Sequence, residues 1–406
     1  MKNNIFELTT EELKNVANSL QKKIEEGLEK DGMEISCIPT YVVPKKEITD
    51  GKVLVLDWGG TNFRAAIVEF KDGNAKVIET KKKLLNAETT EGFNADDLHE
   101  AMAATIGELT CLDSSVTRIG FCFSYPAKCE VNGDAILLRW TKEINIPDMI
   151  GKYVGEPLMK YLNDHRKTNF KDIKVINDTV ACLFAGLSKT GYDSYMGLIV
   201  GTGTNMASLM RLDKIKKLNP FLGFLKSLLH LEVLKEISSI PVNLESGNFY
   251  PPYLTDIDNS VDALSNNKGN QRFEKAISGG YLGKLYKTVF GRNEYDFDGE
   301  DLTNLINIPE KQVAVAQAIY DRSAKLVAAS LAGLVQVLVA QDPSIKRICL
   351  AADGSVFWGK GKNKETYYKE LVDKELTLLL PKDVSITIID EMAEPNLIGS
   401  AIAALS

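Results

Sequence analysis

Two apolar runs joined by a glycine-containing turn constrain this chain more than any other stretch. Residues 54–56 and 65–68 are aliphatic, and the segment DWGGTNFR (residues 57–64) joins them. Short apolar runs bounded by glycine predict two buried β-strands connected by a tight turn. The two glycines allow positive φ and let a ligand approach the main-chain N–H groups closely.

The predicted turn carries groups that suit a polyphosphate and its metal ion. Asp57 ends the first strand, and Thr61, Asn62 and Arg64 follow the glycines. Main-chain N–H donors, a hydroxyl and a guanidinium bind phosphate oxygens, whereas a carboxylate suits Mg²⁺. The same residues also fit an ordinary hairpin with a glycine turn, so this stretch alone leaves both interpretations open.

Length and charge limit the classes of function. A chain of 406 residues exceeds the usual size of a single core, so we expect two domains. Its 44% hydrophobic and 25% charged residues are typical of a soluble globular protein. The formal net charge of −7 leaves no excess of cations to displace counterions, which disfavours a nucleic-acid partner.

Cysteine and histidine usage disfavours a zinc site and a histidine-based nucleophile. The three histidines lie in ordinary contexts, and the six cysteines show no metal-ligand spacing. No signal peptide is evident, so we expect reduced thiols and a cytoplasmic protein. The longest helical pattern, residues 309–341, has an apolar part that is short and flanked by charges. It predicts a buried core helix and no membrane partner.

The other apolar patterns predict an alternation of strands and helices. Thr9 and Glu12 form a capping box for the first helix, which is expected to end near Gly32. Residues 250–269 are rich in Asp, Asn and Pro and predict a loop. Further strands are expected at residues 76–85, 118–123, 173–176, 347–352 and 384–390, and further helices at 93–110, 180–187, 211–241 and from 396 onwards.

The segment from Tyr195 to Met210 repeats the outline of the opening hairpin. An apolar strand, the turn GTGTN (residues 201–205) and a second apolar strand follow one another. We interpret this as a weak internal repeat of two α/β units, each with a phosphate-facing turn. Neither turn has the spacing of a P-loop, and the second lacks the third glycine of a dinucleotide fingerprint.

Four polar pieces accompany these turns and suit a sugar. Carboxylates and amides bind sugar hydroxyls in pairs, and such a site rejects analogues that lack a hydroxyl. Singly, each piece has a simpler explanation, because Asp178 can cap a helix and the other charged residues can be solvated. Their joint occurrence favours one site for a sugar and a polyphosphate. The four pieces are Thr141-Lys142, Asn177-Asp178 at a strand's carboxyl end, Glu245 and Glu274.

With these motifs in hand, the sequence resembles the hexokinase family of the actin-like ATPase fold over nearly its whole length. The segment LDWGGTNFR resembles the family's first phosphate motif, and FSYPA with LLRWTK resembles its sugar-binding signature. The segments VINDTVACL, GLIVGTGTN, NLESGNF, FEKAISGGYLG and AADGSVF follow in the family's order.

The resemblance implies a fold and an activity. The fold is an α/β, two-lobed actin-like ATPase (ribonuclease H-like) fold, in which each lobe is a mixed β-sheet flanked by helices. The small domain would comprise residues 52–178 plus about 393–406, and the large domain residues 1–51 plus 179–392. The activity would be phosphorylation of a hexose at its 6-hydroxyl by ATP with Mg²⁺, feeding glycolysis. Glucose is the first candidate and fructose and mannose are further ones, and the protein would be a monomer or a homodimer.

Carried over position by position, the resemblance also implies roles for individual residues. Asp178 would be the general base, Arg64 and Lys142 would assist catalysis, and Asp57 would hold Mg²⁺ through water. The hexose-binding residues would be Ser124, Pro126, Thr141, Lys142, Asn177, Asp178, Asn205, Glu245 and Glu274. The nucleotide-binding residues would be Asp57, Gly59, Gly60, Thr61, Asn62, Arg64, Thr202, Gly203, Thr204, Gly354 and Ser355.

Three positions depart from the family pattern. Trp58 stands where an aliphatic residue is usual, and the aromatic residue usually found after the glutamate is missing behind Glu245. The glycine-rich stretch near the C-terminus is reduced to EPNLIG (residues 394–399). The second departure leaves the identity of the sugar open, and the third leaves the nucleotide contact there open.

Two other functions are compatible with the same fold. A catalytically silent sugar-sensing protein would keep the hexose residues but could lose Arg64 or Asp178 freely. An actin-like or chaperone-like ATPase would keep the phosphate turns but has no use for Ser124, Thr141-Lys142 and Glu274 together. The complete set of residues therefore favours a hexose kinase.

Overall fold

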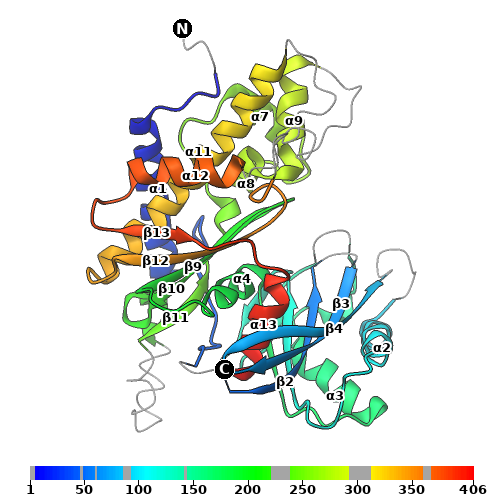
Figure 1. The fold of residues 1–406 in the computed structure, drawn as a ribbon. Coiled ribbons are helices and arrows are strands. Elements are labelled where there is room, and N and C mark those ends of the chain that lie inside the picture. The colour runs from blue at the N-terminus through cyan, green and yellow to red at the C-terminus, as the bar shows by residue number, and fades with distance from the viewer. Residues whose placement is uncertain are drawn as a thin grey trace.

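Two mixed β-sheets flanked by helices make up the protein in a computed structural model (Figure 1). The structure describes residues 5–45, 49–59, 62–85, 93–140, 144–220, 238–291, 312–359 and 367–406. The predicted opening hairpin is confirmed as β2 (Gly51–Trp58) and β3 (Asn62–Lys71), which pair antiparallel along their whole length. The hairpin is the centre of the first sheet.

The first sheet has five strands in the order β4-β3-β2-β5-β8. Strands β5 and β8 run parallel to β2, so their carboxyl ends meet at the same edge. Helices α2 (Ala95–Ile106) and α3 (Gly155–Arg166) share one apolar cluster with the sheet and cover one face. The remaining strands are β4 (Asn74–Leu84), β5 (Arg118–Phe123) and β8 (Asp172–Ile176).

The second sheet has six strands in the order β1-β11-β10-β9-β12-β13. Apart from the short β1, this order matches that of the first sheet strand by strand, with an antiparallel hairpin followed by two parallel strands. The predicted internal repeat is therefore present in the topology. The strands are β1 (Ile38–Pro39), β9 (Ser194–Val200), β10 (Thr204–Arg211), β11 (Ser239–Asn243), β12 (Arg347–Asp353) and β13 (Ser385–Ile388).

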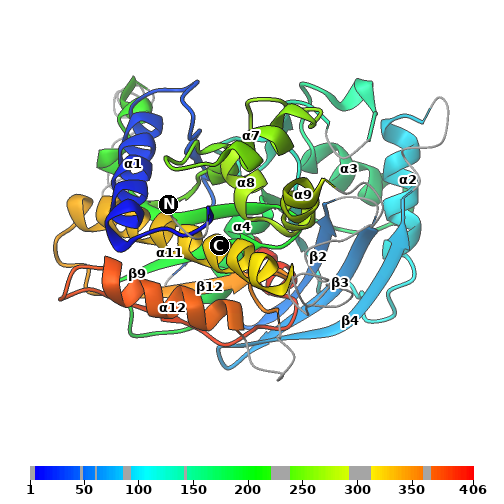
Figure 2. The same ribbon diagram turned by 90° about the horizontal axis from the view of Figure 1, so that it is seen from above.

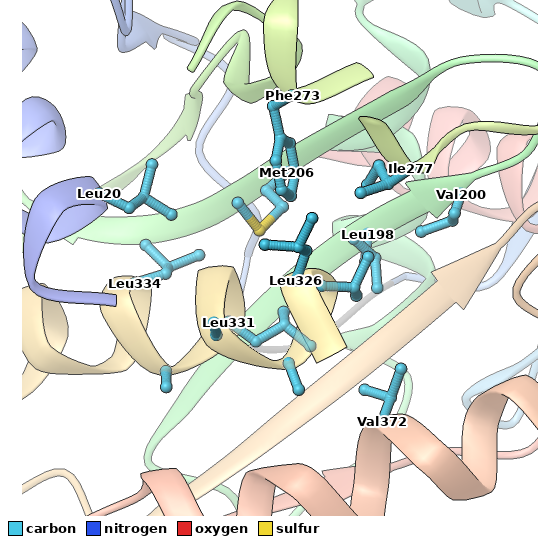
Figure 3. Packing of buried hydrophobic residues seen from close by; sticks show 14 of the residues in the cluster. Leu20, Leu198, Val200, Met206, Phe273, Ile277, Leu326, Leu331, Leu334 and Val372 are labelled. Atoms are coloured by element: carbon cyan, nitrogen blue, oxygen red, sulfur yellow. The ribbon is translucent and has the colours of Figure 1, made fainter. Parts of the chain in front are cut away.

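Helix α11 (Val313–Gln341) is the core of the larger half. By length and composition it could cross a membrane, but 78% of its most apolar window is buried inside the protein. Leu326, Leu331 and Leu334 point toward Met206 and Leu198 of the second sheet (Figure 3). The prediction of a buried core helix is confirmed. The burial of α11 distinguishes it from a membrane span, whereas its length does not.

Two further helices complete this layer on α11. Helix α1 (Thr10–Glu29) begins at the predicted capping box, because Thr9 and Glu12 bond each other's backbone N–H groups. It packs closely on α11, where a Cβ at Gly333 would lie 2.5 Å from the carbonyl oxygen of Ala17. Helix α12 (Tyr367–Leu379) packs on the other side of α11 (Figure 1).

Helices α4 (Asp178–Gly186) and α13 (Pro395–Leu405) lie between the two sheets (Figure 1). α4 packs on β9 and β12 of the second sheet, whereas α13 packs on β2, β5 and β8 of the first. Gly120 on β5 and Gly399 on α13 allow close backbone contacts of α13 with β5 and with α4. A Cβ at Gly120 would lie 1.9 Å from the Ser400 carbonyl oxygen, and one at Gly399 would lie 1.8 Å from that of Ala181.

Two predicted elements differ from the structure. The expected helix over residues 211–241 is wrong at both ends, since β10 runs to Arg211 and β11 begins at Ser239; residues 221–237 lie outside the described part. The loop expected at 250–269 contains α7 (Asp256–Ala263), whose cap is Thr255 with Asp258. This capping box carries Asp in place of Glu, and the turn-forming residues around it conceal the helix signal.

Several elements had no counterpart in the sequence prediction. Helices α8 (Arg272–Ile277) and α9 (Gly279–Phe290) follow α7, and the three lie together in both views (Figures 1 and 2). A short hairpin of β6 (Ala127–Cys129) and β7 (Ala135–Leu137) follows β5. The division into domains at residues 52, 178 and about 393 stays a prediction.

We predict that Gly399→Ala destabilises the protein by about 1–3 kcal/mol, because an added methyl forces the backbones of α13 and α4 apart. Urea or thermal unfolding measures this loss. Gly107→Ala is the matched control, since the nearest atom to its Cβ is 3.3 Å away. Equal stability of the two variants would contradict the close approach of α4 and α13.

Candidate active site

The carboxyl ends of the parallel strands bring Asp57, Ser124 and Asp178 to one edge of the first sheet. Asp57 lies opposite Cys122 in the β2–β5 register, and Cys122 lies opposite Ile176 at the end of β8. The N–H of Ser124 donates to the Trp58 carbonyl at 3.1 Å, which extends this pairing into the loop after β5. Ligands of open α/β sheets bind at such strand ends.

Asp178 is the first residue of α4, and a neighbour shares the capping of that helix. The Asn177 side chain accepts the Thr179 N–H at 2.9 Å and is the N-cap. Oδ1 of Asp178 accepts the same N–H at 2.8 Å and the Thr179 hydroxyl at 3.3 Å. Its Oδ2 has no hydrogen-bond partner among the described residues, and the side chain is half-buried. Capping therefore leaves one carboxylate oxygen of Asp178 for a ligand.

Asp178 influences groups on both sheets, which places it at their junction. Glu245 follows β11 in the chain. Burial raises the pKa of its carboxyl group, and the negative charge of Asp178 raises this pKa further. Burial and the charge of Asp178 likewise raise the pKa of Asp353 at the end of β12. The pKa of the buried Cys122 lies well above its ordinary value, for burial and the charges of Asp57 and Asp178 all disfavour a thiolate.

Arg64 in the first turn lies between two carboxylates. Its Nε donates to Asp57 Oδ2 at 2.9 Å, its Nη2 bonds the same oxygen, and its Nη1 lies 3.6 Å from Glu394 Oε1. Burial alone would lower the pKa of Arg64, but the charges of Asp57 and Glu394 raise it. Gly59 and Asn62 flank the turn, whereas the predicted phosphate ligands Gly60 and Thr61 lie outside the described residues.

The carboxylates at this edge fit a magnesium ion that arrives with a polyphosphate. The negative charges of Asp57 and Asp178 raise the pKa of Asp353, whereas the positive charge of Arg64 lowers it. No three metal-ligating side chains cluster closely enough for a protein cage within the described ranges. Mg²⁺ commonly binds through one carboxylate, water and substrate phosphates, so the donor set suits it.

The second turn, residues 201–204, is held by three neighbouring segments. Gly279 and Gly280 donate their N–H groups to the carbonyl oxygens of Gly201 (2.7 Å) and Thr202 (3.1 Å). Gly354, with φ +112°, lies against β9, where a Cβ would meet the Val200 carbonyl oxygen at 2.3 Å. The predicted nucleotide residues Gly354 and Ser355 are thus brought next to the turn.

The two threonines of the second turn differ in their surroundings. Thr202 is exposed, as a phosphate ligand would be. Thr204 is buried, its hydroxyl donates to the Ile199 carbonyl at 2.8 Å, and its N–H donates to Glu274 Oε2 at 3.0 Å. Both donors of Thr204 are engaged within the protein, so its predicted phosphate contact has no free donor in this structure.

A chain of amides orients the hexose-binding candidate Glu245. Asn205 Nδ2 donates to Asn243 Oδ1 at 2.7 Å, and Asn243 Nδ2 donates to Glu245 Oε1 at 2.8 Å. Asn205 Oδ1 accepts the Ser246 N–H at 3.1 Å. Glu245 adopts the left-handed conformation with φ 58°, a strained geometry that costs about 1–3 kcal/mol and is concentrated at functional sites.

The aromatic ring of Trp58 connects the first turn to the sugar-binding signature. Trp58 is fully buried, and its ring centroid lies 5.1 Å from Tyr125 and 5.5 Å from Trp140. Pro126 accepts the Leu138 N–H at 2.9 Å and so holds the loop before Trp140 beside β6. The predicted ligands Thr141 and Lys142 follow Trp140 directly and lie outside the described residues.

Four residues near the site were not predicted. Asn243 is the first residue of the motif NLESGNF and Asp353 the third of AADGSVF, and their position at strand ends is a signal that the sequence contains. Glu394 precedes α13 at φ 53° and approaches Arg64. Arg139 is exposed on the first half, and its positive charge lowers the pKa of Glu245 on the second. No pattern in the sequence connects these last two residues with their partners.

Known proteins that resemble this chain are hexokinases. A glucokinase of Aspergillus niger is 30% identical over 314 residues, which cover 70% of this chain and 61% of that protein. Hexokinase-2 of Oryza sativa subsp. japonica is 27% identical over 451 residues, which cover 97% of this chain and 87% of that protein. The chain thus spans less than two thirds of the Aspergillus protein and most of the rice protein.

Solved structures share the fold. A hexokinase from Schistosoma mansoni complexed with glucose matches with a TM-score of 0.77 at 22% identity, covering 99% of this chain and 96% of that chain. A ROK hexokinase from Thermus thermophilus matches with a TM-score of 0.54 at 17% identity, covering 87% of this chain and 98% of that chain. Both support the actin-like ATPase fold.

Family models point the same way. One model described as hexokinase matches residues 3–187, and a second one, also described as hexokinase, matches residues 195–295 and 307–406. The chain therefore belongs to the hexokinase family.

Proposed function

We propose that the protein phosphorylates a hexose at its 6-hydroxyl with ATP as donor, and that glucose is the main substrate, with fructose and mannose as further ones. The observation that carries the proposal is Asp178 at the junction of the two sheets, whose Oδ2 has no hydrogen-bond partner within the part of the chain that the structure describes. It lies between the Arg64–Asp57 pair of the first turn and the Glu245 carboxylate on the second half. A sugar between these groups would present one hydroxyl to Asp178 and others to Glu245.

The chain's own residues would align the reactants and balance charge, which is most of what phosphoryl transfer requires. Arg64 would stabilise the negative charge on the transferred group, and exposed Thr202 would bind phosphate oxygens from the other half. Asp178 would orient the 6-hydroxyl and accept its proton. Mg²⁺, held through Asp57, would neutralise the phosphates when bound.

Closure of the two halves would protect the reaction from water. The groups that bind sugar in this proposal come from both halves, with Ser124 on the first and Glu245 on the second. A hexose that bridges them would draw the halves together and expel water, which otherwise competes for the phosphoryl group. We propose a role in glycolysis on the same basis.

A coupled assay with ATP and a panel of hexoses tests the proposal. We expect ADP to form only when a hexose is present. Sugar binding without turnover would instead support a silent sugar-sensing protein. Sugar-independent ATP hydrolysis would support an actin-like or chaperone-like ATPase.

Asp178→Ala is predicted to lower kcat by about 10²–10⁴-fold, because it removes the proton acceptor. Hexose affinity, measured by calorimetry, should fall far less, since Glu245 and its amide neighbours remain. Asp172→Ala is the control, because Asp172 begins β8, the strand before α4, and pairs with Lys174 at 3.0 Å. An equal loss of affinity and turnover would make Asp178 a binding or structural residue.

The raised pKa of Glu245 predicts a pH dependence of hexose binding. An acid with a raised pKa takes up its proton at a higher pH than an ordinary glutamate, whose pKa is about 4.3. The ionised carboxylate forms the stronger hydrogen bonds, so the KM for the hexose should rise as pH falls toward this pKa. Glu245→Gln should have a high KM at all pH values. A KM of the unaltered protein that stays constant down to pH 5 would contradict the assignment.

A further inference from the structure

The candidate sugar ligand Glu274 lies on a helix that is too short to be stable without contacts to neighbouring segments. Helix α8 (Arg272–Ile277) has only six residues, and Gln271 before it adopts the left-handed conformation with φ 50°. Isolated helices of this length are not stable in water. The position of the Glu274 carboxylate therefore depends on what fixes the residues on either side of it.

Lys275, the residue after Glu274, is a buried cation with a full set of acceptors. The side chain is 2% exposed, and Nζ donates to Asp262 Oδ1 at 2.6 Å, Ser265 Oγ at 2.8 Å and the Asn267 carbonyl at 2.9 Å. An ammonium has three donors, so all of them are used. Asp262 lies in the last turn of α7, and the other two acceptors lie in the segment that leads from α7 to α8.

Asp262, at the start of the same segment, also bonds residues near its end. Its two carboxylate oxygens accept the Gly269 N–H at 3.0 Å, and Arg272 Nη1 lies 3.4 Å away. Arg272 Nη2 also donates to Asn259 Oδ1 at 2.7 Å. Burial would raise the pKa of Asp262, but the hydrogen bonds and charges of these partners lower it. Ion pairs of Asp262 with Arg272 and Lys275 thus join the two ends of segment 262–275.

The opposite side of α8 packs closely against the second turn. Glu274 Oε2 accepts the Thr204 N–H at 3.0 Å. A Cβ at Gly203 would lie 2.7 Å from the same oxygen, and one at Gly247 would lie 3.5 Å from the Glu274 Cβ. A small shift of α8 would therefore move the carboxylate relative to the turn and to Glu245, which precedes Gly247 by two residues.

We propose that Lys275 and Asp262 are positioning residues for Glu274, and that their buried pair sets the affinity and selectivity for the hexose. The inference rests on the proposed function. Replacing a buried ion pair by apolar residues is often neutral or stabilising, so stability alone is a weak reason for such a pair. The hydrogen bonds of Lys275 are directional, whereas apolar contacts are not. They fix the segment before α8 at three points and thereby hold Glu274 in one place.

The chain offers a matched control in a second buried ion pair. Arg322 on α11 donates to Asp258 on α7 at 2.7 and 2.8 Å, and the side chains are 1% and 3% exposed. This pair joins α11 to α7 and bonds none of the residues of α8. Its loss should destabilise the same half of the protein without releasing Glu274.

The experiment compares Lys275→Met with Arg322→Met by urea unfolding and by steady-state kinetics. Both variants should lose stability, because Arg322→Met leaves the buried Asp258 without its cation and Lys275→Met leaves Asp262 with Arg272 alone. Only Lys275→Met should raise the KM for the hexose, by at least tenfold and with a smaller change in kcat, which is the signature of lost ground-state binding. Lys275→Arg should recover part of that affinity.

A second readout keeps the result decisive if Lys275→Met does not fold. Asp262→Asn keeps the shape and weakens the clamp, so it should raise the hexose KM in the same direction. It should also narrow the preference between glucose and analogues that lack one hydroxyl. Equal hexose KM values in the Lys275 and Arg322 variants, or an unchanged KM in Asp262→Asn, would overturn the inference. Absence of hexose-dependent turnover in the unaltered protein would instead overturn the proposed function.

Discussion

The close contact of α4 with α13 is the constraint on which the rest of the structure depends. α13 lies on the first sheet and α4 on the second, so their contact is where the two halves meet. Gly399 and Gly120 remove the side chains that would hold the backbones apart. Because α4 begins with Asp178, the same contact delivers that carboxylate to the junction. A fold that brought the sheets together elsewhere would separate Asp178 from one of its two sets of neighbours.

The site is organised around an excess of negative charge. The negative charges of Asp57 and Asp178 raise the pKa of Asp353, the charge of Asp178 raises the pKa of Glu245, and burial raises both of these pKa values. Two like charges 4 Å apart repel by about 4 kcal/mol at an effective dielectric constant of 20, so such an arrangement favours ligands that bring cations or neutral hydroxyls. A magnesium-bound nucleotide brings the former and a sugar the latter. The electrostatics therefore agree with the proposed pair of substrates.

Local signals predicted the parts of the fold that local forces determine. The two hairpins, the capping box at Thr9 and the apolar helix α11 each follow from apolar periodicity, glycine placement or a cap within a few residues. The sequence did not show β11 or α7, because alternating lysines and a run of Asp and Asn concealed them. Site residues next to a motif were predicted as a group. The Thr204 hydroxyl donates to Ile199 nearby, but the engagement of the Thr204 N–H depends on Glu274, 70 residues away, and no local pattern contains that contact.

Glu394 and Arg64 show how a departure in sequence acquires a physical meaning only in three dimensions. Glu394 keeps a side chain at φ 53°, where glycine would be less strained, and the side chain does not cap α13. Its carboxylate instead approaches Arg64, whose other edge is already bonded to Asp57. The guanidinium is therefore neutralised twice before any phosphate arrives. A phosphate that reached Arg64 would compete more readily with Glu394, whose side chain is 38% exposed, than with Asp57, whose side chain is 10% exposed. Replacing Glu394 would let an incoming phosphate take the place of a carboxylate without leaving the arginine unpaired.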